Sequence, residues 1–325
     1  MRRSANEKME VIRIVQDSEL GVKRTLEELG ISRSTFYEWY SRYLTDGFDG
    51  LKSKVPKRSS FWNKIPAKEK QKVVETALEM TELSPRELAF HITDRQGWFI
   101  SESSVYRILK ERNLITSPAW IVMSAADEFK NKTTRVHQQW QTDFTYFKII
   151  GWGWYYLATV LDDYSRYIIA WELSTNMESA DAMRIVNKAL HNAGISETNR
   201  PRLLSDNGSC YISNEFQKFI DDNDMKHVRG APYHPQTQGK IERYHRTMKN
   251  IVKLENYFFP DDLRAKLKAF VDYYNNQRYH ESLQNVTPAD VYFGRANQLL
   301  ERRKQIKNET LKERRKNQIR AVIKT

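Results

Sequence analysis

The chain has 325 residues, of which 53 are Lys or Arg and 41 are Asp or Glu, so its formal net charge is +12. Its content of 40% apolar and 12% aromatic residues is sufficient for hydrophobic cores and excludes a wholly disordered basic protein. No segment approaches the ~18 apolar residues of a membrane span, and the charged N-terminus lacks the apolar stretch of a signal peptide. We therefore expect a cytoplasmic protein without a membrane partner. The single cysteine, Cys210, excludes an intrachain disulfide and any zinc module that needs two thiolates.

The positive charge is concentrated at the two ends of the chain. Residues 1–65 carry a net charge of +4 and residues 301–325 carry +7, whereas residues 66–125 are neutral and residues 126–300 carry only +1. A nearly balanced central segment with basic ends is typical of a globular core with appendages that bind a polyanion. The composition thus points to nucleic acid as the partner.

The first motif in chain order has the spacing of a helix-turn-helix. Apolar residues follow a helical period from Val22 to Leu29, Gly30 turns the chain, and Ser32 is placed to cap a second helix that continues to Tyr43. In this motif the second helix lies in the DNA major groove, so its first turn contacts DNA. The predicted contacts are Arg33, Ser34, Thr35 and Tyr37. An ordinary helical hairpin is the alternative.

A second pattern of the same kind begins at Ser84. Ser84 and Pro85 start a helix, Gly97 breaks it, and Ser101 opens another helix with Val105 on its apolar face. The outward side of this helix presents the predicted DNA contacts Ser103, Ser104, Arg107 and Lys110. Because the segment has no net charge, a helical spacer is the alternative.

From residue 139 the pattern changes to strands. Aromatic and β-branched residues predict an antiparallel meander over 140–150, 154–161 and 166–173. A helix at 179–192, a strand at 201–204, a helix at 214–222, a strand at 226–229 and a further helix follow. This element order is that of a ribonuclease-H-like α/β fold, a mixed five-stranded sheet with flanking helices.

Three carboxylates occupy informative places in this order. Asp143 lies inside the first strand, Asp206 follows the fourth strand, and Glu242 lies in the first turn of the helix after the 232–239 loop. An acidic residue inside an aromatic strand is costly unless something neutralises it. Brought to one point, the three would supply hard oxygen ligands for divalent metals, and two such ions ~4 Å apart can activate a nucleophile and stabilise a leaving oxygen at phosphorus. Taken singly, Asp206 reads as a turn residue and Glu242 as a solvated helix residue.

The motifs Thr142-Asp143, S-D-N-G at 205–208 and P-Y-H-P-Q-T-Q-G-K-I-E-R at 232–243 resemble the DDE transposase and retroviral-integrase superfamily, in particular the transposases of bacterial insertion sequences of the insertion-sequence-three type. The likeness covers roughly residues 130–295. It includes the D-35-E interval between Asp206 and Glu242, with Lys249 seven positions later. The resemblance implies that a helix at 263–278 and the T-P-A-D segment at 287–290 complete the core. Unlike retroviral integrases, the chain has no cysteine-based N-terminal zinc module, which favours the bacterial relatives.

The resemblance and the helical spacing together predict DNA contacts around the active site. Arg246 and Lys249 share a helical face with Glu242, and the loop before this helix reads as a polar flap that closes on DNA. The predicted contacts of this region are Tyr233, His234, Gln236, Gln238, Lys240, Arg243, Arg246 and Lys249. Surface charge is the alternative for the basic residues. His234 is a less favoured general base, and Asp162 and Asp163, which end the second strand, are less favoured metal ligands.

The expected domain order follows from the motifs and from two polar, Pro-containing linkers. It comprises a helix-turn-helix domain at 1–50, a linker at 51–65, a second helix-turn-helix-like domain at 66–115, a linker at 116–135, the catalytic core at 136–295 and a basic tail at 296–325. The tail is predicted to be a basic helix or disordered, and to contact DNA or a second subunit.

We expect a DNA transposase whose N-terminal units bind the terminal inverted repeats and whose core uses two Mg²⁺ ions, or Mn²⁺ in their place, for 3′-end nicking and strand transfer into target DNA. Asp143, Asp206 and Glu242 are the predicted catalytic and metal-binding residues. Since two element ends must be joined, at least a homodimer on DNA is expected. A helix-turn-helix regulator with an inactive core and a ribonuclease-H-like nuclease without strand transfer are the alternatives.

Overall fold

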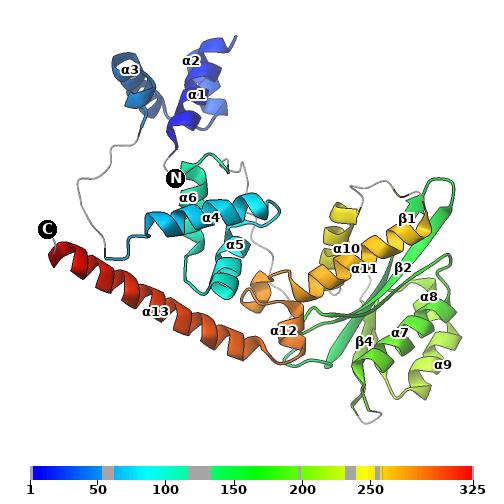
Figure 1. Cartoon of the computed structure of the whole chain (residues 1–325). Coiled ribbons are helices and arrows are strands. Elements are labelled where there is room, and N and C mark those ends of the chain that lie inside the picture. Colours follow the sequence, from blue (N-terminus) through cyan, green and yellow to red (C-terminus); the bar gives the residue numbers. More distant parts are fainter. Residues whose placement is uncertain are drawn as a thin grey trace. The chain divides into compact units, whose positions relative to one another are not determined.

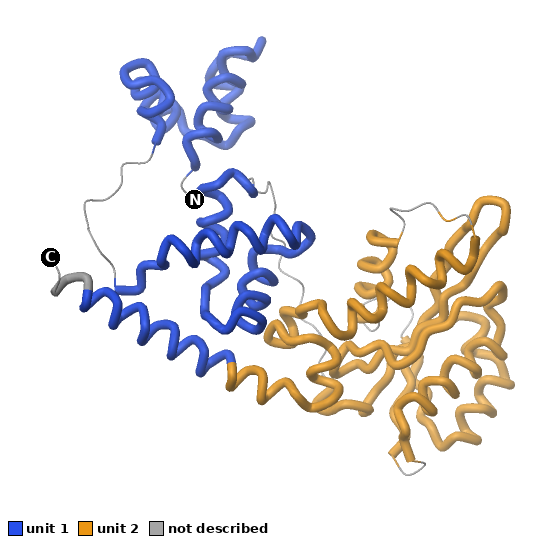
Figure 2. Tube along the Cα trace, in the orientation of Figure 1, with its two compact units in different colours: residues 1–120, 303–325 blue, residues 121–302 orange. Residues whose placement is uncertain are grey.

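The computed structural model describes residues 3–52, 62–115, 133–196, 199–230, 239–252, 257 and 259–323 (Figure 1). The chain divides into two compact units (Figure 2): residues 1–120 with 303–325 form the first, and residues 121–302 form the second. Most of the two predicted linkers, and the predicted contacts Tyr233, His234, Gln236 and Gln238, lie outside the described residues. Among the helices of the described ranges, none has both the length and the hydropathy of a membrane span.

The N-terminal part of the first unit confirms the predicted helix-turn-helix. Its helices are α1 (Ala5–Asp17), α2 (Val22–Glu28) and α3 (Arg33–Gly50). Gly30, the predicted turn residue, has a left-handed conformation with φ 61°, and the Ser32 hydroxyl accepts from the Thr35 backbone N–H as the N-cap of α3. Ile12, Leu26 and Phe36 bring the three helices into one small core. The helix α1 was not predicted, because its charged residues mask the apolar stripe that it buries.

The second predicted helical pair is also present. It comprises α5 (Pro85–His91), the π-helical turn Ile92–Gln96 and α6 (Glu102–Glu111), with α4 (Ala67–Glu79) packed against them. Ser84 and Glu87 form a reciprocal capping box, and Gly97 ends the turn with φ 72°. The core of this region is made by Val73, Leu88, Ile92, Val105 and further apolar residues of the same helices.

The predicted basic tail is the helix α13 (Ala296–Ile323), and its residues from 303 onward belong to the first unit. Two of its arginines are buried in ion pairs with the second helical region. The Arg303 guanidinium donates to both carboxylate oxygens of Asp94, at 2.8 and 2.7 Å, and Arg314 donates to Glu69 at 2.7 Å. The guanidinium groups of Arg303 and Arg314 are therefore paired with carboxylates inside the protein and do not face a DNA phosphate.

The second unit contains the predicted mixed five-stranded sheet. Its strands are β1 (Gln139–Ile149), β2 (Gly153–Asp162), β3 (Ile168–Ser174), β4 (Arg202–Ser205) and β5 (Lys226–Arg229). The spatial order is β3-β2-β1-β4-β5, in which the first three strands are antiparallel and β4 and β5 run parallel to β1. The predicted ribonuclease-H-like arrangement of a mixed sheet with flanking helices is confirmed.

Helices cover both faces of this sheet (Figure 1). One face packs against α7 (Ser179–Ala193), the short α8 (Ser209–Ile212) and α9 (Asn214–Asp222). The other face packs against α10 (Gly239–Val252) and α11 (Pro260–Asn276). The helix α12 (Pro288–Tyr292) comes next in the chain, with Thr287 as its N-cap. Because side chains alternate along β1, Trp140 enters the core under α7 while Phe147 and Ile149 enter the core under α10. The position of Asp143 in this alternation places it on the α10 side.

Candidate active site

Sheet register brings two of the predicted carboxylates together. In the parallel pair of β1 and β4, Gln141 lies opposite Leu204, so Asp143 and Asp206 both follow two residues beyond the last paired position. Asp143 lies inside β1, and Asp206 directly follows the carboxyl end of β4, which is the usual location of sites in open α/β sheets. Asp143 and Asp206 are therefore neighbours by topology.

The electrostatics of Asp206 report this proximity. Burial raises the pKa of the Asp206 carboxyl, and the negative charge of Asp143 raises the pKa further. The backbone N–H of Gly208 donates to Asp206 Oδ1 at 2.9 Å and orients the side chain. The pKa of the nearby Cys210 thiol is raised to about 11 by its burial and by both carboxylates, so this cysteine is not a reactive thiolate. The site is locally negative and suited to a cation.

Glu242 lies in the first turn of α10, as predicted, and its side chain is exposed. Within the described ranges, no group of three His, Cys, Asp or Glu side chains is close enough to hold one metal ion. The structure thus brings together Asp143 and Asp206 but not the complete predicted triad. The position of Glu242 is decided by how the first turn of α10 is held against β1, because the backbone of that turn carries the side chain.

A histidine that the sequence did not single out contacts Asp143. His245 Nδ1 lies 3.2 Å from Asp143 Oδ2, and His245 Nε2 lies 3.5 Å from Thr159 Oγ1, with the imidazole almost wholly buried. His245 is one helical turn after Glu242, so α10 supplies both an exposed carboxylate and a buried partner that orients Asp143. The signal available in the sequence was this spacing of three residues.

The two acids that end β2 are structural residues. Asp162 is fully buried and accepts from the backbone N–H of His137 at 2.8 Å and from the Ser165 hydroxyl at 2.7 Å. Burial raises the pKa of the Asp162 carboxyl. The side chain of Asp163 is 5% exposed and forms an ion pair with Lys240 at 2.5 Å. This buried pair contradicts the prediction that Lys240 contacts DNA, since its ammonium faces Asp163 in the protein interior.

The predicted DNA contacts of the helix-turn-helix regions differ in exposure. Arg33, Ser34 and Tyr37 are exposed at the start of α3, with Tyr37 at 53% exposure, and Thr35 is half-buried beside the Ser32 cap. In α6, Ser103 and Arg107 are exposed and Ser104 is half-buried. Lys110 differs, because its ammonium lies 3.2 Å from Glu7 and its side chain is only 12% exposed. Within this second set, Ser103 and Arg107 therefore present the most accessible polar groups.

The basic residues of α10 lie on two sides of the helix. Arg246 is exposed, and Lys249 lies 4.9 Å above the ring of Tyr146, which is itself 55% exposed. Arg243 donates to the Gly239 carbonyl at 2.8 Å.

Arg243 and Arg246 also line a cavity of about 270 Å³ together with Arg166, Arg278 and His280. Burial and the positive charges of Arg278 and Arg166 lower the pKa of His280 to about 3, so the imidazole is neutral.

The chain matches two kinds of known domain. An integrase core domain matches over residues 133–235 and again over 223–288. A homeodomain-like domain matches over residues 35–109, and a helix-turn-helix domain matches over 7–60. The predicted resemblance to the superfamily of insertion-sequence transposases and retroviral integrases is confirmed, with helix-turn-helix domains preceding an integrase core.

Individual relatives cover parts of the chain. An intracisternal A-particle Pol-related polyprotein of the mouse intracisternal A-particle MIA14 is 37% identical over 113 residues, which are 34% of this chain and 12% of that protein. The transposase for insertion sequence element IS629 of Shigella sonnei is 24% identical over 188 residues, 57% of this chain and 62% of the relative. A structure of the HTLV-2 integrase catalytic core domain in complex with magnesium is 20% identical, covers 49% of this chain and 97% of that chain, and has a TM-score of 0.39. The chain thus spans less than two thirds of the length of these two sequence relatives.

Proposed function

We propose that this chain, with an integrase core behind helix-turn-helix domains, is a DNA transposase that binds the inverted repeats of a mobile element and carries out nicking and strand transfer at their 3′ ends. One observation carries the proposal: Asp143, inside β1, and Asp206, directly after β4, are neighbours within an integrase core domain. Two neighbouring carboxylates are suited to a divalent cation.

The donor set fits Mg²⁺, because its oxygen ligands are hard and the mutual repulsion of Asp143 and Asp206 is relieved by a cation. We assign Asp143, Asp206 and Glu242 as its ligands, with Glu242 joining the other two through its exposed side chain. These residues would hold two such ions, or Mn²⁺ in their place, and the ions would supply activation of the attacking oxygen and stabilisation of the leaving oxygen at phosphorus.

The protein residues around these ligands orient the carboxylates and hold the DNA. His245 fixes the carboxylate of Asp143 from the buried side of α10, and the Gly208 N–H fixes that of Asp206. Arg246 and Lys249 lie on α10 near Glu242 and bind phosphates of the strand that is cut. Arg243 supports the same contact. The loop residues Tyr233, His234, Gln236 and Gln238 contact the DNA end from the segment before α10.

End recognition is assigned to the first unit. The exposed first turn of α3, with Arg33, Ser34, Thr35 and Tyr37, reads the major groove, and Ser103, Ser104 and Arg107 of α6 extend the contact. Joining two DNA ends requires two copies, so we propose at least a homodimer on DNA. Since phosphate contacts release counterions, end binding should weaken steeply with salt.

A nicking and joining assay tests the proposal. Purified protein is incubated with labelled end DNA and Mg²⁺, and pre-nicked ends are incubated with a plasmid. Asp143→Asn, Asp206→Asn and Glu242→Gln should each lower nicking by at least ~10³-fold and leave end binding within about twofold, because only the reacting centre loses a ligand. Glu215→Gln, an exposed carboxylate on α9, is the matched control.

Each other outcome of the assay identifies a different protein. Specific end binding without nicking by the wild-type chain would make it a helix-turn-helix regulator with an inactive core. Nicking without plasmid joining would make it a nuclease. Retained nicking in one of the three variants would remove that residue from the assigned site.

A further inference from the structure

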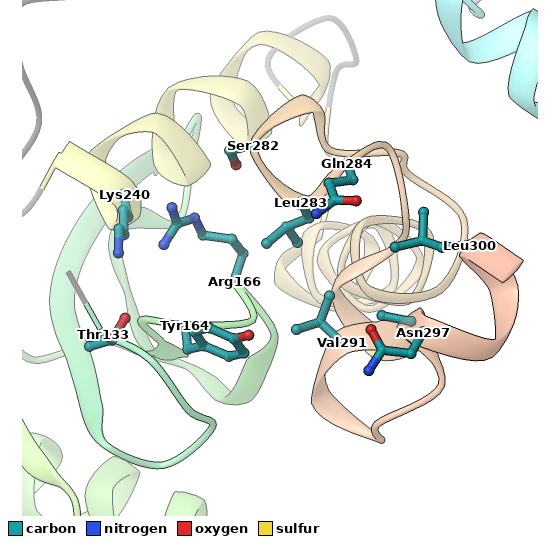
Figure 3. Close-up of a pocket in the computed structure, with 11 residues that line it drawn as sticks. Thr133, Tyr164, Arg166, Lys240, Ser282, Leu283, Gln284, Val291, Asn297 and Leu300 are labelled. Atoms are coloured by element: carbon teal, nitrogen blue, oxygen red, sulfur yellow. The ribbon is translucent and has the colours of Figure 1, made fainter.

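A buried polar network lies behind the proposed metal ligands and joins three elements of the core. The carboxylate of Asp163 lies at its centre: Oδ1 accepts from Gln141 Nε2 at 2.6 Å, and Oδ2 accepts from Lys240 Nζ at 2.5 Å and from Thr133 Oγ1 at 2.6 Å. Lys240 Nζ also donates to the Asp163 carbonyl at 3.0 Å. Figure 3 shows Lys240 directed from α10 toward Thr133, the residue with which it shares this carboxylate.

The network is placed so that it sets the spacing of two proposed ligands. Gln141 precedes Asp143 by two residues on β1, and Lys240 precedes Glu242 by two residues on α10. The Gln141 side chain closes the link, because its Oε1 accepts from the backbone N–H of Ile241 at 3.1 Å. This N–H is one of those that the first turn of a helix leaves without a helical partner. The first turn of α10 is thus bonded to β1 both directly and through Asp163.

Burial makes this arrangement specific. The side chains of Lys240 and Asp163 are 8% and 5% exposed, and Gln141 is wholly buried. A buried ammonium and carboxylate need one another, because either alone would be an uncompensated charge in the interior. A substitution of one partner therefore affects the other. Because both side chains are buried, solvent does not screen this ion pair as it screens an ion pair on the surface.

We propose that Asp163, Lys240 and Gln141 are positioning residues that hold the first turn of α10, which carries Glu242, against β1, which carries Asp143, so that the exposed Glu242 side chain joins Asp143 when a divalent cation binds. This inference rests on the proposed function of the triad. It assigns to Lys240 a role inside the protein in place of a DNA contact. Site geometry depends on such supporting bonds, because a ligand displaced by ~1 Å no longer binds productively.

The test uses the full chain and the variants Lys240→Met, Asp163→Asn and the double variant. The double variant removes both charges and so leaves no unpaired ion if one single variant folds poorly. Lys188→Met is the matched control, because Lys188 also contacts a carboxylate, that of Glu172 at 3.5 Å, and a backbone carbonyl, that of Trp171 at 3.2 Å, but is 46% exposed on α7. Gln141→Leu breaks the link to α10 without changing a charge.

The readouts are hydrogen exchange of the peptide covering residues 239–245, Mn²⁺ binding measured by electron paramagnetic resonance, and the Mg²⁺ concentration that half-saturates nicking. In the network variants, exchange of this peptide should quicken at least tenfold, and Mn²⁺ affinity and the Mg²⁺ requirement should each worsen at least tenfold. End binding without metal should stay within twofold. The effects of the double variant should not exceed those of the worse single variant, because the network acts as one unit.

Three results would overturn the inference. Unchanged exchange at 239–245 would show that the network does not hold α10. Quickened exchange with unchanged Mn²⁺ affinity and Mg²⁺ requirement would make the network structural only. Weakened end binding as the main effect of Lys240→Met would restore the DNA contact. A wild-type chain that binds Mn²⁺ and does not nick would refute the proposed function, while exchange and Mn²⁺ binding would still decide the role of the network.

Discussion

The ion pair between Arg303 and Asp94 should be a principal stabiliser of the first unit. Arg303 binds both oxygens of Asp94 at 2.8 and 2.7 Å, the two side chains are 8% and 11% exposed, and the guanidinium lies 4.6 Å from the ring centroid of Phe90. Replacing Arg303 by Met takes the guanidinium away from the buried Asp94 carboxylate. Breaking a buried pair in this way costs ~3–5 kcal/mol.

The assay is differential scanning calorimetry of the full chain, with the transition of the integrase core as an internal reference. For a unit of this size, ~1 kcal/mol shifts the Tm by roughly 2–4 °C, so Arg303→Met should lower the Tm of the first unit by about 10 °C. Arg302→Met is the matched control, because Arg302 is the exposed neighbour on the same helix. In this variant the Tm of the first unit should change by less than about 2 °C.

A second variant separates the cost of an unpaired charge from the loss of packing. In Arg303→Met/Asp94→Leu both charges are gone, so most of the lost Tm should return. Equal Tm values for the Arg302 and Arg303 variants would refute the reasoning, and so would a double variant no more stable than the single one. Either result would mean that this ion pair is not a principal stabiliser of the first unit.

Three further predictions concern DNA and the active site. Arg33→Ala should weaken end binding and reduce the slope of log affinity against log salt by ~1 if Arg33 contacts a phosphate, and an unchanged slope in a gel-shift titration would contradict this contact. Gly208→Ala should impair nicking more than stability, because its Cβ would lie 2.9 Å from Asp206 Oδ1 and displace that carboxylate; nicking equal to wild type would refute it. Because the pKa of the Asp206 carboxyl is raised, protons compete with Mg²⁺ for it at a higher pH than for an ordinary aspartate. The Mg²⁺ concentration that nicking requires should therefore increase as the pH falls, and the residual nicking of Asp206→Asn should lack this increase.

Sequence patterns determined most of the architecture. Runs of aromatic, β-branched and other apolar residues between turns predicted the five strands, and Ser32, Ser84 and Ser101 marked helix starts that the structure confirms. These features depend on neighbours within a few residues, which the sequence displays directly. That Asp143 and Asp206 are neighbours depends on the parallel pairing of β1 and β4, which the sequence motifs did not display.

Only the tertiary structure decided which charges face outward. Lys240 has the charge and the sequence position of a DNA contact, yet it binds Asp163, 77 residues earlier. In the basic helix α13, Arg303 binds Asp94, 209 residues earlier. The contact of His245 with Asp143 likewise requires α10 to lie across β1. A charged side chain becomes a buried partner or a surface contact according to what the fold places beside it, and no local pattern contains that partner.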